Sequence, residues 1–118
     1  MTSFDCDSLL PLPTTTFHVL MALASGDMHG YAIIQDIAAR TDNKLRIGAA
    51  TLYRSLQRML DQGLIVEIET RPAPEFDDER RRYYRITKFG EAAARAETRR
   101  IKDLVRMARA SGFVDGRA

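Results

Sequence analysis

A run of hydroxyl and guanidinium side chains within residues 49–62 has the chemistry to read DNA. If this segment is helical, four of them recur at i, i+3, i+4 and i+7 and share one face: Thr51, Arg54, Ser55 and Arg58. An arginine on such a face can donate two hydrogen bonds to O6 and N7 of a guanine. The alternative is a solvated face, on which Arg58 pairs with Asp61 or Gln62 of the same helix.

The opposite face of the same segment is apolar and would pack on a core. Its members lie at helical spacing: Ala49, Leu52, Leu56, Met59 and Leu60. Gly63 then ends the helix, and residues 64–69 change to the alternating pattern of a strand. A short helix with a core face and a donor-rich face, followed at once by a strand, is typical of a helix that lies in a DNA major groove.

Three side chains on or near this helix have two possible roles each. Thr51 can reach a phosphate, which we favour, or it can hydrogen-bond the preceding turn. Tyr53 carries a hydroxyl on an apolar ring, so it either contacts a phosphate while packing on the core or is purely structural. Tyr31, earlier in the chain, has the same two possibilities, and we favour core packing for it.

The elements that position this helix are predicted from periodicity and turn residues. We expect helices over 14–24, 30–40 and 49–62, strands over 64–69 and 80–87, and a proline-rich acidic loop over 70–79. Thr14, Thr15 or Thr16 caps the first helix, and residues 44–47 form a short strand or an irregular link. The second helix is expected to bury Tyr31, Ile34, Ile37 and Ala38. Three helices and a two-stranded wing make a winged helix-turn-helix over residues 14–87, which is mainly α with a small β-hairpin.

A long helix over residues 88–110 remains after this domain is complete. It follows an N-terminal extended segment at 1–13 and the winged domain, and it precedes a tail at 111–118 that we expect to be disordered. Its apolar stripe lies beyond the wing, where the small core is too short to cover all of it. We expect a second copy of the chain to cover this stripe, through Ala93, Ile101, Leu104, Val105 and Ala108.

A homodimer of this kind would offer a route to regulation by a small molecule. A ligand that prefers one angle between the subunits shifts the population between dimers that bind DNA and dimers that do not. The hypothetical pocket lies between the last helix and the partner's first helix, near Phe17, Met21, Ile101, Leu104 and Met107.

The densest positive charge is the run Arg80, Arg81 and Arg82, with Arg85 beyond it. On the second wing strand these arginines could hold phosphates or flank the minor groove. Two glutamates of the first wing strand offer cross-strand ion pairs instead. We expect Arg81 and Arg85 to pair with those glutamates, which leaves Arg80 and Arg82 for DNA.

The net charge of +2 in 118 residues says little about partners, but its distribution is uneven. Residues 1–79 carry six Lys and Arg against twelve Asp and Glu, whereas residues 80–118 carry twelve against four. This asymmetry indicates a localised basic surface or a solvated helix. No apolar run approaches the roughly 20 residues of a membrane span. No signal peptide is visible, so we expect a cytoplasmic protein without a membrane partner.

The sequence gives no support for catalysis or for metal binding. No nucleophile stands beside a histidine and an acid, and no glycine-rich phosphate loop is present, so we expect neither an enzyme nor a cofactor. Cys6 is the single cysteine, which excludes an internal disulfide. His18 and His29 have no cysteine near them in the chain, so we expect no metal site and a structural role for both.

Three motifs together resemble the PadR family of transcriptional regulators. They are His29-Gly30-Tyr31-Ala32-Ile33, Ala50-Thr51-Leu52-Tyr53 followed by Gly63-Leu64-Ile65, and Arg82-Tyr83-Tyr84-Arg85-Ile86-Thr87. They stand in the family's order and spacing, and the resemblance covers residues 9–108. It implies a homodimeric repressor that binds an inverted repeat in double-stranded DNA and is usually released by a small molecule. The single C-terminal helix resembles the short subclass of the family, in which that helix builds the dimer.

A winged-helix domain can also serve purely in protein–protein interaction, because a fold alone does not establish a function. A protein-docking helix more often exposes aliphatic or aromatic anchors than the hydroxyls and guanidinium groups found on residues 49–62. The acidic wing loop keeps this second function open. The sequence therefore predicts a dimeric DNA-binding regulator, with a protein-interaction module as the alternative.

Overall fold

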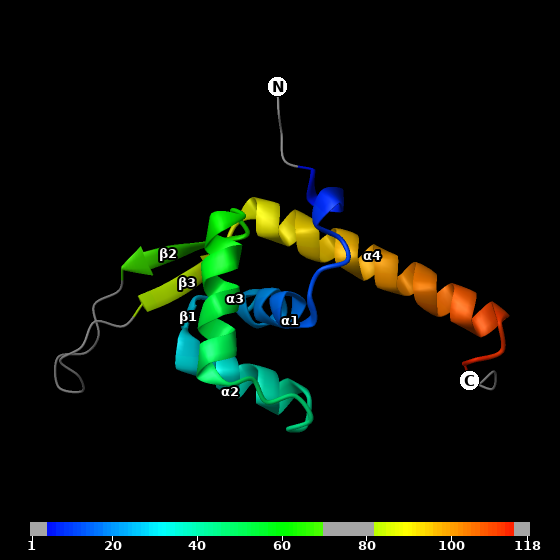
Figure 1. The fold of residues 1–118 in the computed structure, drawn as a ribbon, viewed down its shortest axis with the longest axis horizontal. Coiled ribbons are helices and arrows are strands. Elements are labelled where there is room, and N and C mark those ends of the chain that lie inside the picture. Colours follow the sequence, from blue (N-terminus) through cyan, green and yellow to red (C-terminus); the bar gives the residue numbers. More distant parts are fainter. Residues whose placement is uncertain (1–4, 70–81, 115–118) are drawn as a thin grey trace.

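The computed structural model describes residues 5–69 and 82–114, which form a mainly helical domain with one small sheet (Figure 1). The elements in chain order are the 3-10 helix η1 (Cys6–Leu9), α1 (Thr14–Leu23), β1 (Met28–His29), α2 (Gly30–Arg40), α3 (Ala49–Asp61), β2 (Ile65–Glu69), β3 (Arg82–Ile86) and α4 (Lys88–Ala110). Three helices, a small antiparallel sheet and a long final helix confirm the predicted winged helix-turn-helix fold.

The core lies where α1, α2 and α3 pack together and meet the start of α4. Its largest fully buried side chains come from all three helices, the turn after α3 and the start of β2: Val19, Leu20, Ile33, Ile37, Leu52, Leu56, Met59, Leu64 and Ile65. The buried residues of each helix recur three or four positions apart, as Thr16, Leu20 and Leu23 do in α1. The predicted buried face of α2 was wrong at one end, because Ile33 is buried there and Tyr31 is exposed.

The sheet has three strands, one more than predicted. β3 lies between β1 and β2 and pairs antiparallel with both, with Met28 opposite Tyr84 and Glu67 opposite Tyr84 on the other side. Residues 44–47 form the irregular link and no strand. The additional strand is β1, which is formed by the two residues before α2. The predicted loop at 70–79, together with Arg80 and Arg81, lies outside the described residues.

The starts of α1 and α3 lack side-chain caps. The residue before α1 is Pro13, and no threonine side chain caps that helix, so the predicted threonine cap was wrong. Gly48 precedes α3 and likewise offers no capping side chain. The end of α3 is as predicted, because Gly63 adopts a φ of 79° and its N–H donates to the carbonyl of Leu60 at 3.1 Å.

Thr87 connects the end of α3 to the start of α4. Its hydroxyl oxygen accepts the Gly90 N–H at 2.9 Å, as a helix cap does. The same hydroxyl lies 2.7 Å from the Gly63 carbonyl oxygen and 3.0 Å from that of Leu64, so it donates its hydrogen to this turn. The Thr87 N–H also donates to Leu64 O at 3.1 Å. A Cβ added at Gly90 would collide with the Leu64 carbonyl oxygen, so only glycine permits this approach.

The N-terminal segment is not the extended segment that was predicted. Residues 6–9 form η1, which packs against α4 of the same chain (Figure 1). Leu12 is buried in the core, and its N–H donates to Glu97 Oε1 at 3.3 Å. Glu97 is almost fully buried and also accepts two hydrogen bonds of 2.8 Å from Arg100. The leucines of this segment therefore dock on their own chain.

The start of the C-terminal tail is also more ordered than predicted. Gly112 has a φ of 87° and donates to the Arg109 carbonyl at 3.0 Å, and Phe113 N–H donates to Ala108 O at 2.9 Å. This is the glycine-containing termination that many helices use. Residues 111–114 thus form a turn that ends α4, and residues 115–118 lie outside the described residues.

We expect acid to weaken the contact at Glu97. The hydrogen bonds from Arg100, supported by the one from Leu12, hold the pKa of this carboxyl below its usual value of 4.5. Because the folded pKa is the lower one, the carboxylate stabilises the fold at neutral pH, and that contribution is lost as the pH falls below about 4.5. Glu97→Gln should be less stable than the wild type at neutral pH, and the difference in the free energy of unfolding should shrink as the pH falls below about 4.5, in urea unfolding at each pH.

Asp103→Asn is the matched control for this measurement. Asp103 pairs with Arg106 at a half-exposed position, where an ion pair contributes about 0–1 kcal/mol. Its replacement should change the pH dependence of unfolding little. The prediction would be contradicted if the free energies of unfolding of the wild type and Glu97→Gln differed by the same amount at every pH across the acid range.

Candidate nucleic-acid interface

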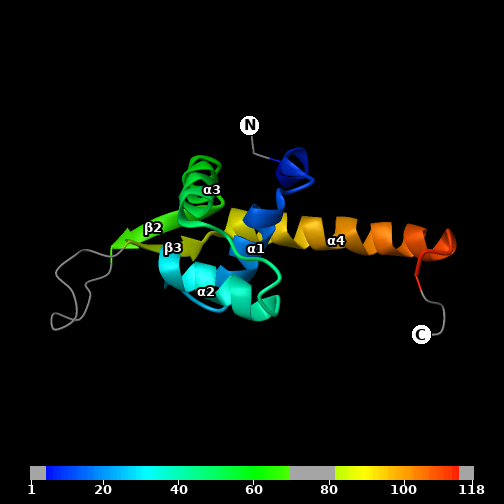
Figure 2. The ribbon, with the colours of Figure 1, turned by 60° about the horizontal axis from the view of Figure 1, so that its bottom comes forward.

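The outward face of α3 is the best candidate for a DNA-contacting surface. α3 lies on the outside of the domain in both views (Figure 1, Figure 2). The helix is amphipathic: Leu52, Leu56 and Met59 are buried, whereas the predicted donor face is exposed at Thr51, Arg54 and Arg58 and half-buried at Ser55. The expected separation of the two faces is confirmed, except that Ala49 is exposed.

Arg54 and Arg58 are available for a ligand. Among the described residues, neither guanidinium group forms an ion pair or a side-chain hydrogen bond. The alternative pairing of Arg58 within its own helix is not formed, because Asp61 accepts a hydrogen bond of 3.3 Å from Gln57 Nε2 instead. Two unpaired arginines one helical turn apart can approach bases or phosphates without breaking an existing contact.

Two tyrosines lie beside this face at the starts of α2 and α3. The Tyr53 ring packs directly against Gly30, leaving no space for a side chain at that glycine. Tyr53 is half-exposed, and the hydroxyl end of its ring is the part that lies against Gly30 of α2. Tyr31 is 63% exposed, and the core role favoured for it was wrong. Tyr84 of β3 is buried, and burial, with the nearby charge of Glu67, raises its pKa.

The wing arginines are arranged differently from the prediction. Arg85 pairs with Asp27, through hydrogen bonds of 3.1 and 2.9 Å, and these bonds lower the pKa of Asp27. Arg82 Nε lies 3.6 Å from a carboxylate oxygen of Glu67, and the Arg82 side chain remains mostly exposed. The predicted pairing of Arg85 with a wing glutamate is therefore wrong, and Glu67 pairs with Arg82, which was expected to be free. Arg80 and Arg81 lie outside the described residues.

Basic residues just before α3 were missed by the sequence reasoning. Lys44 and Arg46 are exposed in the irregular link that leads into the helix. Their position within five residues of the helix start was the available signal, because side chains there can reach the backbone of a DNA bound by α3.

The predicted dimer stripe on α4 divides into two parts. Ala93 is fully buried by the chain's own core, so it has no surface to offer a partner and the prediction for it is corrected. The second half of α4 extends away from the domain in both views (Figure 1, Figure 2). There Leu104 is 47% exposed, Met107 is 55% exposed and Val105 is also exposed, whereas Ile101 and Ala108 are partly covered.

The structure brings together only part of the predicted ligand pocket. Phe17 and Met21 line a groove between α1 and α4. Ile101 lines a second groove along α4, and Leu104 and Met107 line neither of these two. The first groove also contains three cations that the sequence reasoning missed: Arg95, Arg99 and Lys102. Their i, i+4, i+7 spacing was the signal that could have found them.

Asp5, Cys6 and Asp7 are the one group among the described residues whose ligand atoms lie close enough to hold a metal ion together. Asp5 already has a structural role, since its Oδ1 accepts the Asp7 N–H at 3.1 Å and caps η1. In the part of the chain that the structure describes, no helix has both the length and the hydropathy to cross a membrane.

Three helices, a small sheet and an exposed, donor-bearing third helix define a winged helix-turn-helix protein. The sequence profile of the "Transcriptional regulator PadR-like family" matches residues 19–96, from α1 into the first part of α4. The chain belongs to this family.

Two protein relatives support this assignment. The chain is 38% identical over 74 residues to a protein of Lysinibacillus sphaericus named Uncharacterized protein X, a match to 63% of this chain and 65% of that one. It is 33% identical over 89 residues to Transcriptional regulator Rv3488 of Mycobacterium tuberculosis, which covers 75% of this chain and 77% of the relative. The match thus spans just under two thirds of the first relative.

Solved structures show the same fold. A transcriptional regulator from Clostridium thermocellum superposes with a TM-score of 0.72 at 25% identity, over 96% of this chain and 100% of that one. Bacillus subtilis PadR, solved in complex with operator DNA, superposes with a TM-score of 0.63 at 18% identity, over 71% of this chain and 46% of that one. The superposition on the Clostridium thermocellum regulator covers 96% of this chain, whereas the family profile matches only residues 19–96. The structural similarity therefore extends beyond the residues that the profile matches.

We expect a side chain at Gly30 to disturb α3 through Tyr53. The Cβ of Gly30→Ala would overlap the Tyr53 hydroxyl, so this half-exposed ring must shift, and we expect a destabilisation smaller than the roughly 1–3 kcal/mol that overpacking costs in a closed core. The double variant Gly30→Ala/Tyr53→Ala should be less destabilised than the sum of the single variants, by about 0.5–3 kcal/mol, because the clash is absent. Urea unfolding measures all three variants.

Gly48→Ala is the control for the added methyl group, because a Cβ at Gly48 meets open space. If the changes in unfolding free energy of the two single variants add up to that of the double variant, the Tyr53 ring does not exclude a side chain at Gly30.

Proposed function

We propose that this chain is a DNA-binding transcriptional regulator of the cytoplasm that represses transcription as a homodimer on an inverted-repeat operator. The observation that carries the proposal is the outward face of α3, where Arg54 and Arg58 are exposed and unpaired among the described residues. Membership in the family supports it, as does the complex of Bacillus subtilis PadR with operator DNA.

The proposed contacts divide into base reading and phosphate binding. Arg54 and Arg58 would hydrogen-bond guanine edges or phosphates, and Thr51 and Ser55 would bind the sugar-phosphate backbone at the helix start. Phosphate contacts are also proposed for the other predicted residues: Tyr31, Tyr53, Arg80, Arg81 and Arg82. The exposure of Tyr31 and the accessible side of Tyr53 support their part in this set.

Binding to a fragment of the protein's own promoter region, compared with a pool of genomic fragments, tests the DNA contacts. Arg54→Ala/Arg58→Ala should weaken specific binding by about 2–6 kcal/mol if both arginines read bases, at about 1–3 kcal/mol each. For each arginine that binds phosphate instead, the slope of log affinity against log salt should decrease by about one. Fluorescence anisotropy over a salt series measures both quantities.

Arg40→Ala is the matched control, because Arg40 lies near the end of α2 and pairs with Asp36 on the same helix. It should retain wild-type operator affinity. Weak binding that is indifferent to sequence across the whole pool, and unchanged in the double variant, would favour the alternative of a protein-interaction module.

The proposed dimer forms through the second half of α4. Leu104, Val105 and Met107 are exposed apolar side chains on a helix that the domain does not cover there. An exposed apolar stripe on a projecting helix is stabilised when a second copy buries it. Two recognition helices held in this way would read half-sites about one helical turn apart, or a multiple of it.

Leu104→Glu should shift the protein toward monomer, because it places a charge in the proposed apolar seam. Arg106→Gln is the matched control: it changes the net charge by the same amount, at an exposed side chain that pairs with Asp103. Sedimentation velocity over a concentration series distinguishes the two states. A monomeric wild type, or a dimer that Leu104→Glu leaves intact, would contradict the proposed interface.

Release of the operator by a small molecule is the last part of the proposal. The groove between α1 and α4 is the supporting feature, since a ligand there would contact both the DNA-binding domain and the proposed dimerisation helix. A ligand that favours one angle between these elements would change the distance between the two recognition helices.

A further inference from the structure

The outermost line of α3 differs from the donor face that the sequence predicted. Leu52, Leu56 and Met59 are fully buried and define the side of the helix that faces the core. The positions most directly opposite them follow one another at spacings of four, three and four residues: Ala50, Arg54, Gln57 and Asp61. All four are exposed. A helix that presents this side to a major groove places this line nearest to the base edges.

The side-chain amide of Gln57 is held in one orientation by Asp61. Its Nε2 donates a hydrogen bond of 3.3 Å to Asp61 Oδ1, one turn further along the helix. A carboxylate only accepts hydrogen bonds, so this contact determines which end of the amide is the nitrogen. Among the described residues, the amide forms no other hydrogen bond. The amide oxygen and the second N–H of Nε2 therefore remain available, as an acceptor beside a donor.

An acceptor beside a donor is the complement of adenine in the major groove. Adenine presents its N6 amino group as a donor and N7 as an acceptor there, whereas guanine presents two acceptors, O6 and N7. Gln57 can therefore form two hydrogen bonds with adenine and only one with guanine. An amide whose orientation is fixed in advance also loses less conformational freedom on binding than a freely rotating one.

The position of Asp61 is otherwise difficult to explain on a surface that binds DNA. It is the only acid of α3, and its negative charge on the outermost line of the helix repels phosphates. It does not pair with Arg58, which lies three residues earlier, and its hydrogen bond goes to Gln57 instead. A Gln–Asp contact at this spacing stabilises a helix only slightly. Holding an amide that reads a base gives this acid a role.

We propose that Gln57 reads an adenine of the operator, with Nε2 donating to N7 and the amide oxygen accepting from the N6 amino group, and that Asp61 positions this amide. The inference rests on the proposed function and deepens it, because it names a base that each half-site contains. Arg54 lies three residues before Gln57, about 4.5 Å along the helix axis, and successive base pairs are about 3.4 Å apart. The two side chains therefore reach neighbouring base pairs.

Replacement of single atoms in the DNA tests the proposed contact. Selection from a random duplex library first gives the sequence that the full chain binds most tightly, without knowledge of the operator. Each adenine of that sequence is then replaced in turn by 7-deazaadenine, which has a carbon in place of N7 and still pairs with thymine. At one adenine of each half-site, the replacement should weaken wild-type binding about threefold or more in fluorescence anisotropy.

Gln57→Ala identifies the side chain that makes the contact. This variant should bind the unmodified sequence and the sequence with 7-deazaadenine at the sensitive position equally well, because the group that recognises N7 is absent. Gln35→Ala is the matched control, since it removes the same side chain from an exposed position of α2, and it should keep the wild-type sensitivity. A Gln57→Ala protein that is as sensitive as the wild type at every adenine would overturn the proposal.

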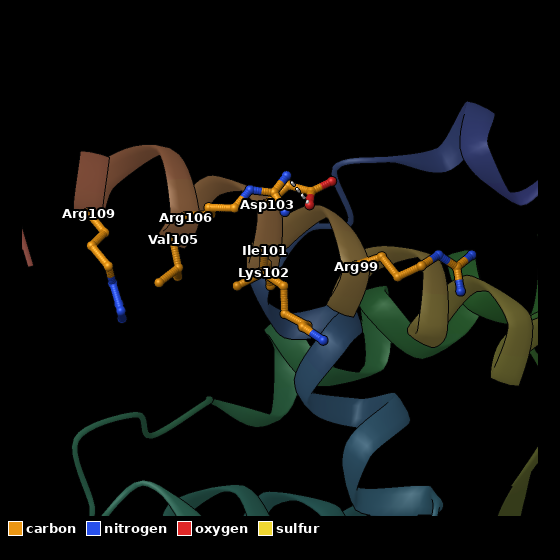
Figure 3. Close-up of a pocket in the computed structure, with 7 residues that line it drawn as sticks. All are labelled: Arg99, Ile101, Lys102, Asp103, Val105, Arg106 and Arg109. Atoms are coloured by element: carbon orange, nitrogen blue, oxygen red, sulfur yellow. Dashed lines mark hydrogen bonds and ion pairs between the residues drawn. The ribbon is translucent and has the colours of Figure 1, made fainter. Parts of the chain in front are cut away.

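Asp61→Ala distinguishes positioning from a merely structural role. It should reduce the effect of 7-deazaadenine, while affinity for unrelated DNA should increase because a negative charge is removed. Asp61→Asn should restore the effect, since its amide oxygen can accept the same bond from Gln57. Asp103→Ala removes an equal charge from α4, where Asp103 bonds Arg106 (Figure 3), and should leave the effect unchanged. Full sensitivity in Asp61→Ala would refute the positioning role.

The selection experiment separates this inference from the proposed function. If the wild type binds every duplex of the library alike, the proposed function fails and this inference fails with it. If a preferred sequence is found but none of its adenines depends on Gln57, the protein is a sequence-specific DNA-binding protein and only the proposed adenine contact is overturned.

Discussion

The hydroxyl group of Thr87 fixes the relation between the two helices on which the proposed function depends. It caps α4 at Gly90 and donates to the turn that ends α3, so the exit of one helix and the start of the other share a hydrogen-bonded junction. The missing side chain of Gly90 lets the backbones approach closely. Because the connection is direct, we expect a rotation of α4 to be transmitted to α3.

The same junction explains how a ligand between α1 and α4 could act on a surface that it does not touch. The groove is lined by Ile86, which is the last residue of β3 and the neighbour of Thr87. A group bound there lies against α4 one to four turns from its start. Its effect on α3 would need no chain of intermediate residues, only a change in the angle at which α4 leaves the domain.

The features that the sequence predicted well are those set by local periodicity. The two faces of α3 follow from a 3.6-residue repeat, and α4 has the predicted bounds because Thr87 and the turn at Gly112 delimit an uninterrupted helical segment. The errors involve partners far away in the chain. β1 exists because Met28 meets Tyr84, and Arg85 pairs with Asp27, so neither could be read from neighbouring residues. The predicted ligand pocket did not include the cations that line the groove between α1 and α4, because only apolar residues were considered for it.

The contact between Leu12 and Glu97 has a consequence for how the protein is made. These residues are 85 positions apart, yet the backbone N–H of the buried leucine donates a hydrogen bond to the buried carboxylate. While the chain emerges from the ribosome, η1 lacks the helix that it packs on until α4 has been synthesised. A chain interrupted before α4 would therefore leave the Leu12 N–H without its Glu97 partner and η1 without the helix that it packs on. Nascent molecules would reach their final packing only when the helix proposed for dimerisation is already present.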